Sequence, residues 1–225
     1  MRDKLKLALA GSLVTGILLS AVPAGAVMIT AVDLGTGAPP TTLGGYTMTP
    51  FGPDPAPEFS TVTSVASPLG GAVTFSIGLS HRVIGSGWAT WSHGYSGDVY
   101  YTVGALSVTL TLPAGTAAFY LYAEPNPFAI HTITVTANDG TFLSVPVDGQ
   151  AGANGYGFYL SGPGSLTTLT VSSPTTDFAI GEFGIAKLSG TPTLPEGWVG
   201  SAGLWVLGLT LASLAGLRRR EAGQL

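Results

Sequence analysis

The chain contains no cysteine, and charged residues make up only 9% of its 225 residues. The absence of cysteine excludes disulfides, thiolate metal sites and cysteine catalysis. Soluble globular proteins average about 25% charged residues, so this chain is unusually poor in charge. Runs with helical period are missing from its central part, whereas 33 Gly and 16 Pro supply frequent turns. This composition favours short strands joined by loops.

Positive charge is scarce between residues 27 and 196, which contain ten acidic residues and only two basic ones, Arg82 and Lys187. That span therefore carries a net charge near −8, which disfavours binding to polyanions and excludes nucleic acid as an expected partner. The other six basic residues lie at the two ends of the chain, in residues 2–6 and 218–220.

Residues 1–26 have the features of a secretory signal peptide. A positively charged start precedes an apolar run over residues 7–22, and Pro23 then interrupts the run. Ala24 and Ala26 provide the pair of small residues that signal peptidase accepts. We expect cleavage after Ala26, so that the mature chain begins at Val27. The alternative is an uncleaved membrane anchor.

Residues 197–217 are free of charge. As a helix with a rise of about 1.5 Å per residue, they would be about 30 Å long and would match the bilayer core. Arg218, Arg219 and Arg220 follow directly and are expected to remain in the cytoplasm. The sequence thus predicts one transmembrane helix, with the domain outside and residues 218–225 as a basic cytoplasmic tail. A buried core helix is the alternative, but it would be shorter and show a polar face.

The residues before this helix resemble a bacterial sorting signal. Pro195-Glu196 is similar to the start of the PEP-CTERM box, and a second set of residues resembles the Pro-Thr-Leu-Ser-Glu-Trp pattern of IPTL-CTERM proteins: Pro192, Thr193, Leu194, Glu196 and Trp198. Gly197 departs from both patterns. The resemblance covers about the last 35 residues. It implies processing by an exosortase-like membrane protease, a transient stay in the inner membrane, and a final place at the cell surface or in an exopolysaccharide-rich matrix.

Residues 27–187 show apolar and polar residues in alternation, which is typical of strands with one buried face. Strands are expected at residues 28–33, 60–66, 73–79, 99–103, 107–112, 117–123, 132–136, 142–147, 156–161, 166–172 and 178–186. Asn138-Asp139-Gly140 predicts a hairpin turn. Residues 35–58 are rich in Pro and Gly and are expected to form a loop or irregular arm. We predict an antiparallel β-sandwich or jelly roll, with residues 188–196 as linker and sorting box.

One loop combines several aromatic side chains with polar ones: Trp88, Trp91, His93, Tyr95 and Asp98. Exposed aromatic rings stack on sugar rings, and the neighbouring polar groups can bond hydroxyls. The loop is therefore a candidate polysaccharide-binding surface. The alternative is that the two Trp side chains cap the core of the domain, since large aromatic residues dominate core burial.

No catalytic residues are predicted, because a glycoside hydrolase requires two carboxylates held about 5–10 Å apart. Glu124 and Glu182 lie beside apolar residues, and burial there would either raise a pKa or serve a structural hydrogen bond. Asp139 and Asp148 have the sequence context of turn formers. The three His residues show no metal spacing, so no metal site and no cofactor are predicted; a structural Ca²⁺ in the loops at residues 138–140 or 148–150 is a further alternative.

These observations favour a non-enzymatic, exported surface or matrix protein with a structural or adhesive role. A carbohydrate-binding module is the first alternative, and a secreted hydrolase is the second. Exposed, coplanar Trp88 and Trp91 in a groove would favour binding, whereas burial of both would favour the structural role.

Overall fold

The computed structural model describes residues 27–188, and this part of the chain contains strands and no helix. The predicted all-β antiparallel class is thereby confirmed. The predicted signal peptide, sorting box and transmembrane helix lie outside the described residues. Between residues 27 and 188, no helix is long and apolar enough to cross a bilayer.

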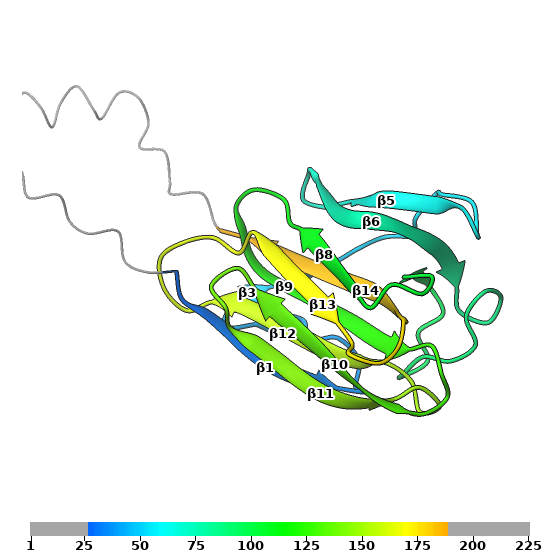
Figure 1. Ribbon diagram of the computed structural model, residues 1–225. Coiled ribbons are helices and arrows are strands. Elements are labelled where there is room, and N and C mark those ends of the chain that lie inside the picture. Colours follow the sequence, from blue (N-terminus) through cyan, green and yellow to red (C-terminus); the bar gives the residue numbers. More distant parts are fainter. Residues whose placement is uncertain (1–26, 189–225) are drawn as a thin grey trace, which may run out of the picture.

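Strands account for most of the described chain (Figure 1). In chain order they are β1 (Ile29–Gly35), β2 (Thr42–Leu43), β3 (Tyr46–Thr47), β4 (Thr49–Pro50), β5 (Thr61–Ala66), β6 (Ala72–Val83), β7 (Asp98–Tyr101), β8 (Ser107–Thr111), β9 (Thr116–Pro125), β10 (Ile130–Ala137), β11 (Phe142–Asp148), β12 (Asn154–Leu160), β13 (Thr168–Ser172) and β14 (Phe178–Lys187). Every strand predicted from the alternation is present. The three shortest, β2, β3 and β4, were not predicted.

Twelve of the strands form one hydrogen-bonded sheet, with the order β1-β12-β9-β14-β7-β6-β8-β13-β10-β11 and with β4 and β5 attached to β14 and β6. The long strand β6 joins two halves of this sheet, because its early residues pair with β8 and its last residues pair with β7. The sheet curls so that its two ends approach each other. Asp139, in the β10–β11 turn, accepts a hydrogen bond from the backbone N–H of Ile29 at 2.9 Å. The arrangement is nearly barrel-like.

The core lies between the two halves of the sheet and is filled by alternate residues of each strand. Tyr156 on β12 donates a buried hydrogen bond across this core to the backbone oxygen of Ile133 on β10, at 3.2 Å. The rings of Tyr100 and Phe183 stack with centroids 5.6 Å apart. The β10–β11 hairpin turns at residues 138–140 as predicted, with Gly140 at φ 88°.

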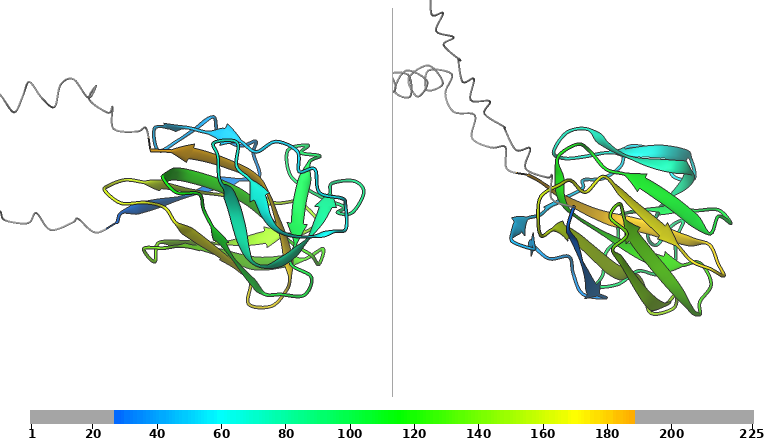
Figure 2. Two further views of the ribbon diagram at one scale, coloured as in Figure 1. Left: turned by 90° about the horizontal axis from the view of Figure 1, so that it is seen from above. Right: turned by 60° about the vertical axis from the view of Figure 1, so that its left-hand side comes forward.

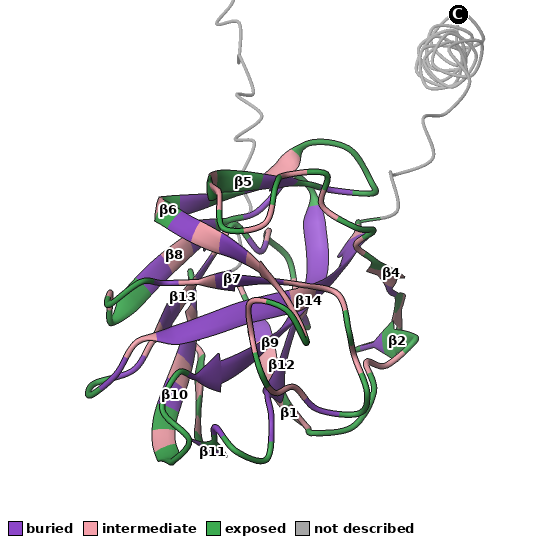
Figure 3. Ribbon diagram, turned by 90° about the vertical axis from the view of Figure 1, so that its right-hand side faces the viewer, coloured by how far each residue is buried: buried purple, intermediate pink, exposed green. Residues whose placement is uncertain are grey.

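Strand β9 is buried along its whole length, and Figure 3 shows it and β14 in the buried colour. Its second face is covered by the Pro/Gly-rich arm, which packs Leu43 and Met48 against Tyr120 and Tyr122. The arm is therefore a packed layer over the sheet. Gly44 has φ +59°, and a side chain there would collide with the ring of Tyr159, so the arm needs glycine at this close approach.

The first and last described residues lie at the same end of the domain (Figures 1 and 2). Leu188 donates its backbone N–H to Gly115 at 2.8 Å, and Lys187 pairs with Thr116 at the start of β9. Strand β9 then runs to Pro125, which pairs with Phe178. Ten residues at about 3.3 Å each place Pro125 about 30 Å from this end. We call the end near Pro125 the distal end.

Candidate functional site

The aromatic loop occupies residues 84–97, between β6 and β7, at the distal end. Its backbone departs from ordinary geometry at three places: Gly85 and Gly94 have φ of 84° and 77°, and His93 has φ 42°. Glycine tolerates this region freely, whereas a side chain such as that of His93 adopts it at a cost. Side-chain hydrogen bonds to two glutamates of the sheet hold the loop in this conformation.

The first half of the loop is held by Glu124, near the end of β9. The indole N–H of Trp88 donates to Glu124 Oε2 at 3.1 Å, and the hydroxyl of Thr90 contacts Glu124 Oε1. The Thr90 hydroxyl also lies 3.1 Å from the backbone oxygen of Gly149. The Trp88 ring packs beside that of Tyr101, with centroids 5.4 Å apart. Both indole and hydroxyl are thus oriented by one carboxyl group.

The second half of the loop is held by Glu182, on β14. The indole N–H of Trp91 donates to Glu182 Oε2 at 2.9 Å, and Nε2 of His93 lies 2.7 Å from Glu182 Oε1. The other ring nitrogen of His93 lies 3.1 Å from the backbone oxygen of Thr36, in the arm. The imidazole is only 13% exposed. His93 therefore links the loop to both the sheet and the arm.

Glu182 reaches the loop because the pairing of β14 with β9 is interrupted beside it. The register shifts between Gly181 and Gly184, and Glu182 itself has φ 50°. A β-bulge of this kind redirects a side chain. The neighbouring Phe183 remains in the core while Glu182 bonds the loop. The bulge thus allows two consecutive residues to serve the core and the loop.

Burial raises the pKa of Glu124 to about 7, although the bonds from Thr90 and Trp88 work in the opposite direction. Its side chain has no solvent exposure, and a charged carboxylate without a counter-cation is costly there. Burial also raises the pKa of Glu182, against the effect of His93 and Trp91. Glu124 is buried and Glu182 is half-buried, in line with the burial expected from their apolar neighbours, and each makes structural hydrogen bonds.

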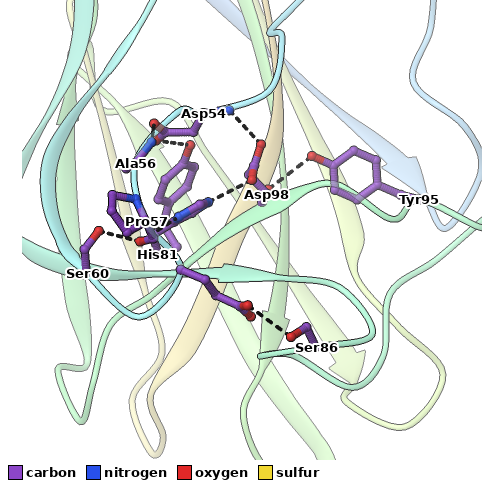
Figure 4. A network of polar contacts seen from close by, with 10 residues as sticks. Asp54, Ala56, Pro57, Ser60, His81, Ser86, Tyr95 and Asp98 are labelled. Atoms are coloured by element: carbon purple, nitrogen blue, oxygen red, sulfur yellow. Dashed lines mark hydrogen bonds and ion pairs between the residues drawn. The ribbon is translucent and has the colours of Figure 1, made fainter.

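The last predicted residues, Tyr95 and Asp98, belong to a separate network that fastens the arm to β6 and β7 (Figure 4). Asp98 lies 2.8 Å from Nε2 of His81 and accepts the backbone N–H of Asp54, also at 2.8 Å. Tyr95 donates to the backbone oxygen of Asp98 at 3.1 Å. Burial opposes the charged form of His81, but the bonds to Asp98 and to the Pro57 oxygen outweigh it and raise the pKa of His81.

The predicted site is therefore divided into three parts. Trp88 borders a hollow of about 230 Å³, and Tyr95 and Asp98 border another of about 360 Å³. Trp91 and His93 are bound to Glu182 and line neither hollow. Trp88 and Trp91 are both half-buried, and each uses its only polar atom within the protein. What the loop offers to a ligand is therefore ring surface.

Two residues beside the Trp88 hollow were not among the predicted site residues. Asn126 and Phe128 follow β9 and line the hollow together with Trp88 and Thr90. Their one sequence signal is the run Pro125-Asn126-Pro127-Phe128, which places an aromatic residue in a Pro-rich turn. Phe128 is 62% exposed.

Asp139 and Asp148 act as turn formers, as predicted: each accepts the backbone N–H of the residue two positions later, Thr141 and Gln150. Within residues 27–188, no group of three or more His, Asp or Glu side chains is arranged to hold a metal ion. No protein-family model matches the chain, and no curated protein matches it.

Proposed function

We propose that the chain is an exported surface or matrix protein with an adhesive role, held at one end by its C-terminal helix. The observation that carries this proposal is the position of the ends. Both Val27 and Leu188 lie at the end of the domain opposite the aromatic loop. If residues 197–217 anchor the chain, the loop faces away from the membrane at a distance of about 30 Å.

The strand order supports an assignment of the domain as a jelly roll. Strands β7-β14-β9-β12 form one four-stranded half, and β8-β13-β10-β11 form the other. Apart from the β10–β11 hairpin, consecutive strands from β7 to β14 alternate between the halves, which is the pattern of two Greek keys. Strands β1–β6 are additions to it. This fold presents its loops at the two ends, which suits a domain that is tethered at one end and binds at the other.

A carbohydrate-binding role is the second candidate, and the hollow beside Trp88 favours it. A hydrolase is not proposed. Glu124 has no exposed surface, and both of its oxygens contact donors within the protein. Glu182 is similarly engaged by Trp91 and His93. General acid–base chemistry requires a carboxyl group within reach of the substrate proton.

Mass spectrometry of the mature protein tests the export part of this proposal. We expect an N-terminus at Val27, because signal peptidase would cut after Ala26. We also expect loss of the residues after about Glu196, including the cluster Arg218–Arg220. Recovery of an intact tail from every cell fraction would contradict processing but not anchoring. Recovery of the uncut N-terminus from a soluble cytoplasmic fraction would refute the proposal as a whole.

A further inference from the structure

The hollow beside Trp88 is formed by two loops that meet at the distal end. Gly87, Trp88 and Thr90 come from the aromatic loop, and Asn126 and Phe128 come from the turn after β9. Glu124 lies beneath them. The hollow has a volume of about 230 Å³, which is smaller than the roughly 300–1,000 Å³ typical of sites for drug-sized ligands. A hollow of this size suits one small ring.

Two aromatic side chains, Trp88 and Phe128, line the hollow. The indole nitrogen of Trp88 is occupied by Glu124, so this side chain offers only its ring. Phe128 offers a ring that is 62% exposed. The C–H face of a sugar ring is apolar and flat, and it packs on aromatic rings for the same reason that other apolar surfaces do. Such an arrangement favours a ligand that has a flat apolar face.

Polar groups lie at the edge of the same hollow. Asn126 donates from Nδ2 to Tyr101 and Asp177, at 3.2 and 3.3 Å, which leaves its amide oxygen as an acceptor. The residue is exposed, so a ligand hydroxyl can reach it. A ligand with C–H groups on its face and hydroxyls around its rim can contact both the aromatic residues and the polar edge of the hollow.

Trp88 and Asn126, two of the residues that line the hollow, are held in place without a ligand. Asp177 accepts the backbone N–H of Gly104 at 2.9 Å, contacts the hydroxyl of Tyr101, and bonds Asn126. Glu124 positions Trp88 on the other side. A ligand that enters the hollow therefore need not order these side chains, which removes one of the main costs of binding.

Charge restricts the ligand further. Lys and Arg are absent from the lining, and residues 27–188 contain nine acidic and two basic residues, a net charge of −7. Phosphate, sulfate and uronic acid groups would be repelled. We propose that the hollow binds one uncharged pyranose ring of a glycan, stacked on Trp88 and Phe128 with Asn126 bonding its hydroxyls. This inference rests on the proposed adhesive function and names its ligand class and contact site.

Titration of full-length protein in a detergent without sugar headgroups tests the inference. The probes are the methyl glycosides of glucose, galactose, mannose and N-acetylglucosamine, followed by tryptophan emission and by saturation-transfer NMR. We expect saturable binding of at least one glycoside. Phe128→Ala should weaken it about fivefold, as expected for the loss of one ring contact worth about 1 kcal/mol. Asn126→Ala should weaken it as well.

Phe142→Ala is the matched control. Phe142 is also 62% exposed, but it lies on β11 opposite Thr136, next to the turn whose Asp139 bonds Ile29 at the other end of the domain. We expect unchanged binding for this variant. Equal losses in both variants, or glycan binding that Phe128→Ala leaves unchanged, would overturn the site.

Failure of all four glycosides to bind would overturn the inference while leaving the proposed function to its own test. That function is decided by processing and surface exposure, which do not depend on the hollow. Folding of each variant is checked by its far-UV circular dichroism and thermal unfolding. Because both Phe side chains are mostly exposed, we expect these to remain those of the wild type.

Discussion

Glu124→Gln should make the domain more stable at alkaline pH than the wild type. The pKa of Glu124 is about 7 in the folded protein and near 4.5 in the unfolded chain. Between these values the folded state holds a proton that the unfolded state has lost, so stability falls as pH rises. At about 1.4 kcal/mol per pKa unit, the cost of ionising this buried carboxyl is about 3 kcal/mol above pH 7.

Glutamine reproduces the hydrogen bonds of the protonated acid. Its oxygen accepts from Trp88, and its amide nitrogen donates to the hydroxyl of Thr90, which then donates to the Gly149 oxygen. We therefore expect Glu124→Gln and wild type to have similar stability near pH 4.5. At pH 8 the variant should be more stable by about 3 kcal/mol, or roughly 6–12 °C in Tm for a domain of this size.

Thermal and urea unfolding of the full-length protein between pH 4.5 and 8.5, followed by circular dichroism, measures this difference. The comparison at pH 4.5 is the internal control, because residue 124 is uncharged in both folded proteins there. Parallel curves for Glu124→Gln and wild type would refute the reasoning, as would a variant less stable than wild type at every pH.

Two further predictions concern the contacts that hold the arm and the loop. Because the pKa of His81 is raised in the folded protein, its bond to Asp98 stabilises the fold most below about pH 6.5 and less as pH rises through the pKa of the folded state. Asp98→Asn should reduce this pH dependence of stability, which is measured as Tm against pH. Gly152→Ala should destabilise the protein by about 2 kcal/mol or more, because φ is +107° and the new Cβ would lie 2.6 Å from the carbonyl carbon of Trp91. Gly37→Ala, with open space around its Cβ, should change Tm little, and equal effects of the two glycine substitutions would contradict this account.

The strands were predictable because their signal is local. The alternation of Val73, Phe75, Ile77 and Leu79 with small or polar residues reveals a half-buried strand without reference to the rest of the chain. The β10–β11 turn is similarly marked by Asn-Asp-Gly. In contrast, the single sheet that joins both halves depends on β6, whose two ends pair with different strands. A change of partner along one strand leaves no local pattern.

The arm was expected to be irregular because Pro and Gly interrupt any periodic pattern in residues 35–58. Its packing depends on Leu43 and Met48, two isolated apolar residues that contact β9 about 75 positions later. The continuous apolar character of β9 itself was a readable sign of burial on both faces. That sign does not identify which segment covers the second face.

The aromatic loop was singled out from the sequence, but its partners were not paired with it. Trp88 bonds a residue 36 positions away, and Trp91 bonds one 91 positions away. Glu124 and Glu182 were both noted as candidates for burial, since each lies among apolar neighbours. Their contact with the indoles requires the bulge in β14 and the antiparallel pairing of β9 with β14. Both features arise only when the chain folds.

Labelling of a single introduced thiol tests the central claim, that the distal end of an exported domain is displayed outside the cell. The chain has no cysteine, so Ser96→Cys, in the exposed part of the loop, provides one reactive site. Ser173→Cys is the control, because Ser173 is 2% exposed and should react only after unfolding. We predict that a membrane-impermeant maleimide labels Ser96→Cys on intact cells. Labelling of Ser96→Cys only after lysis would contradict the claim.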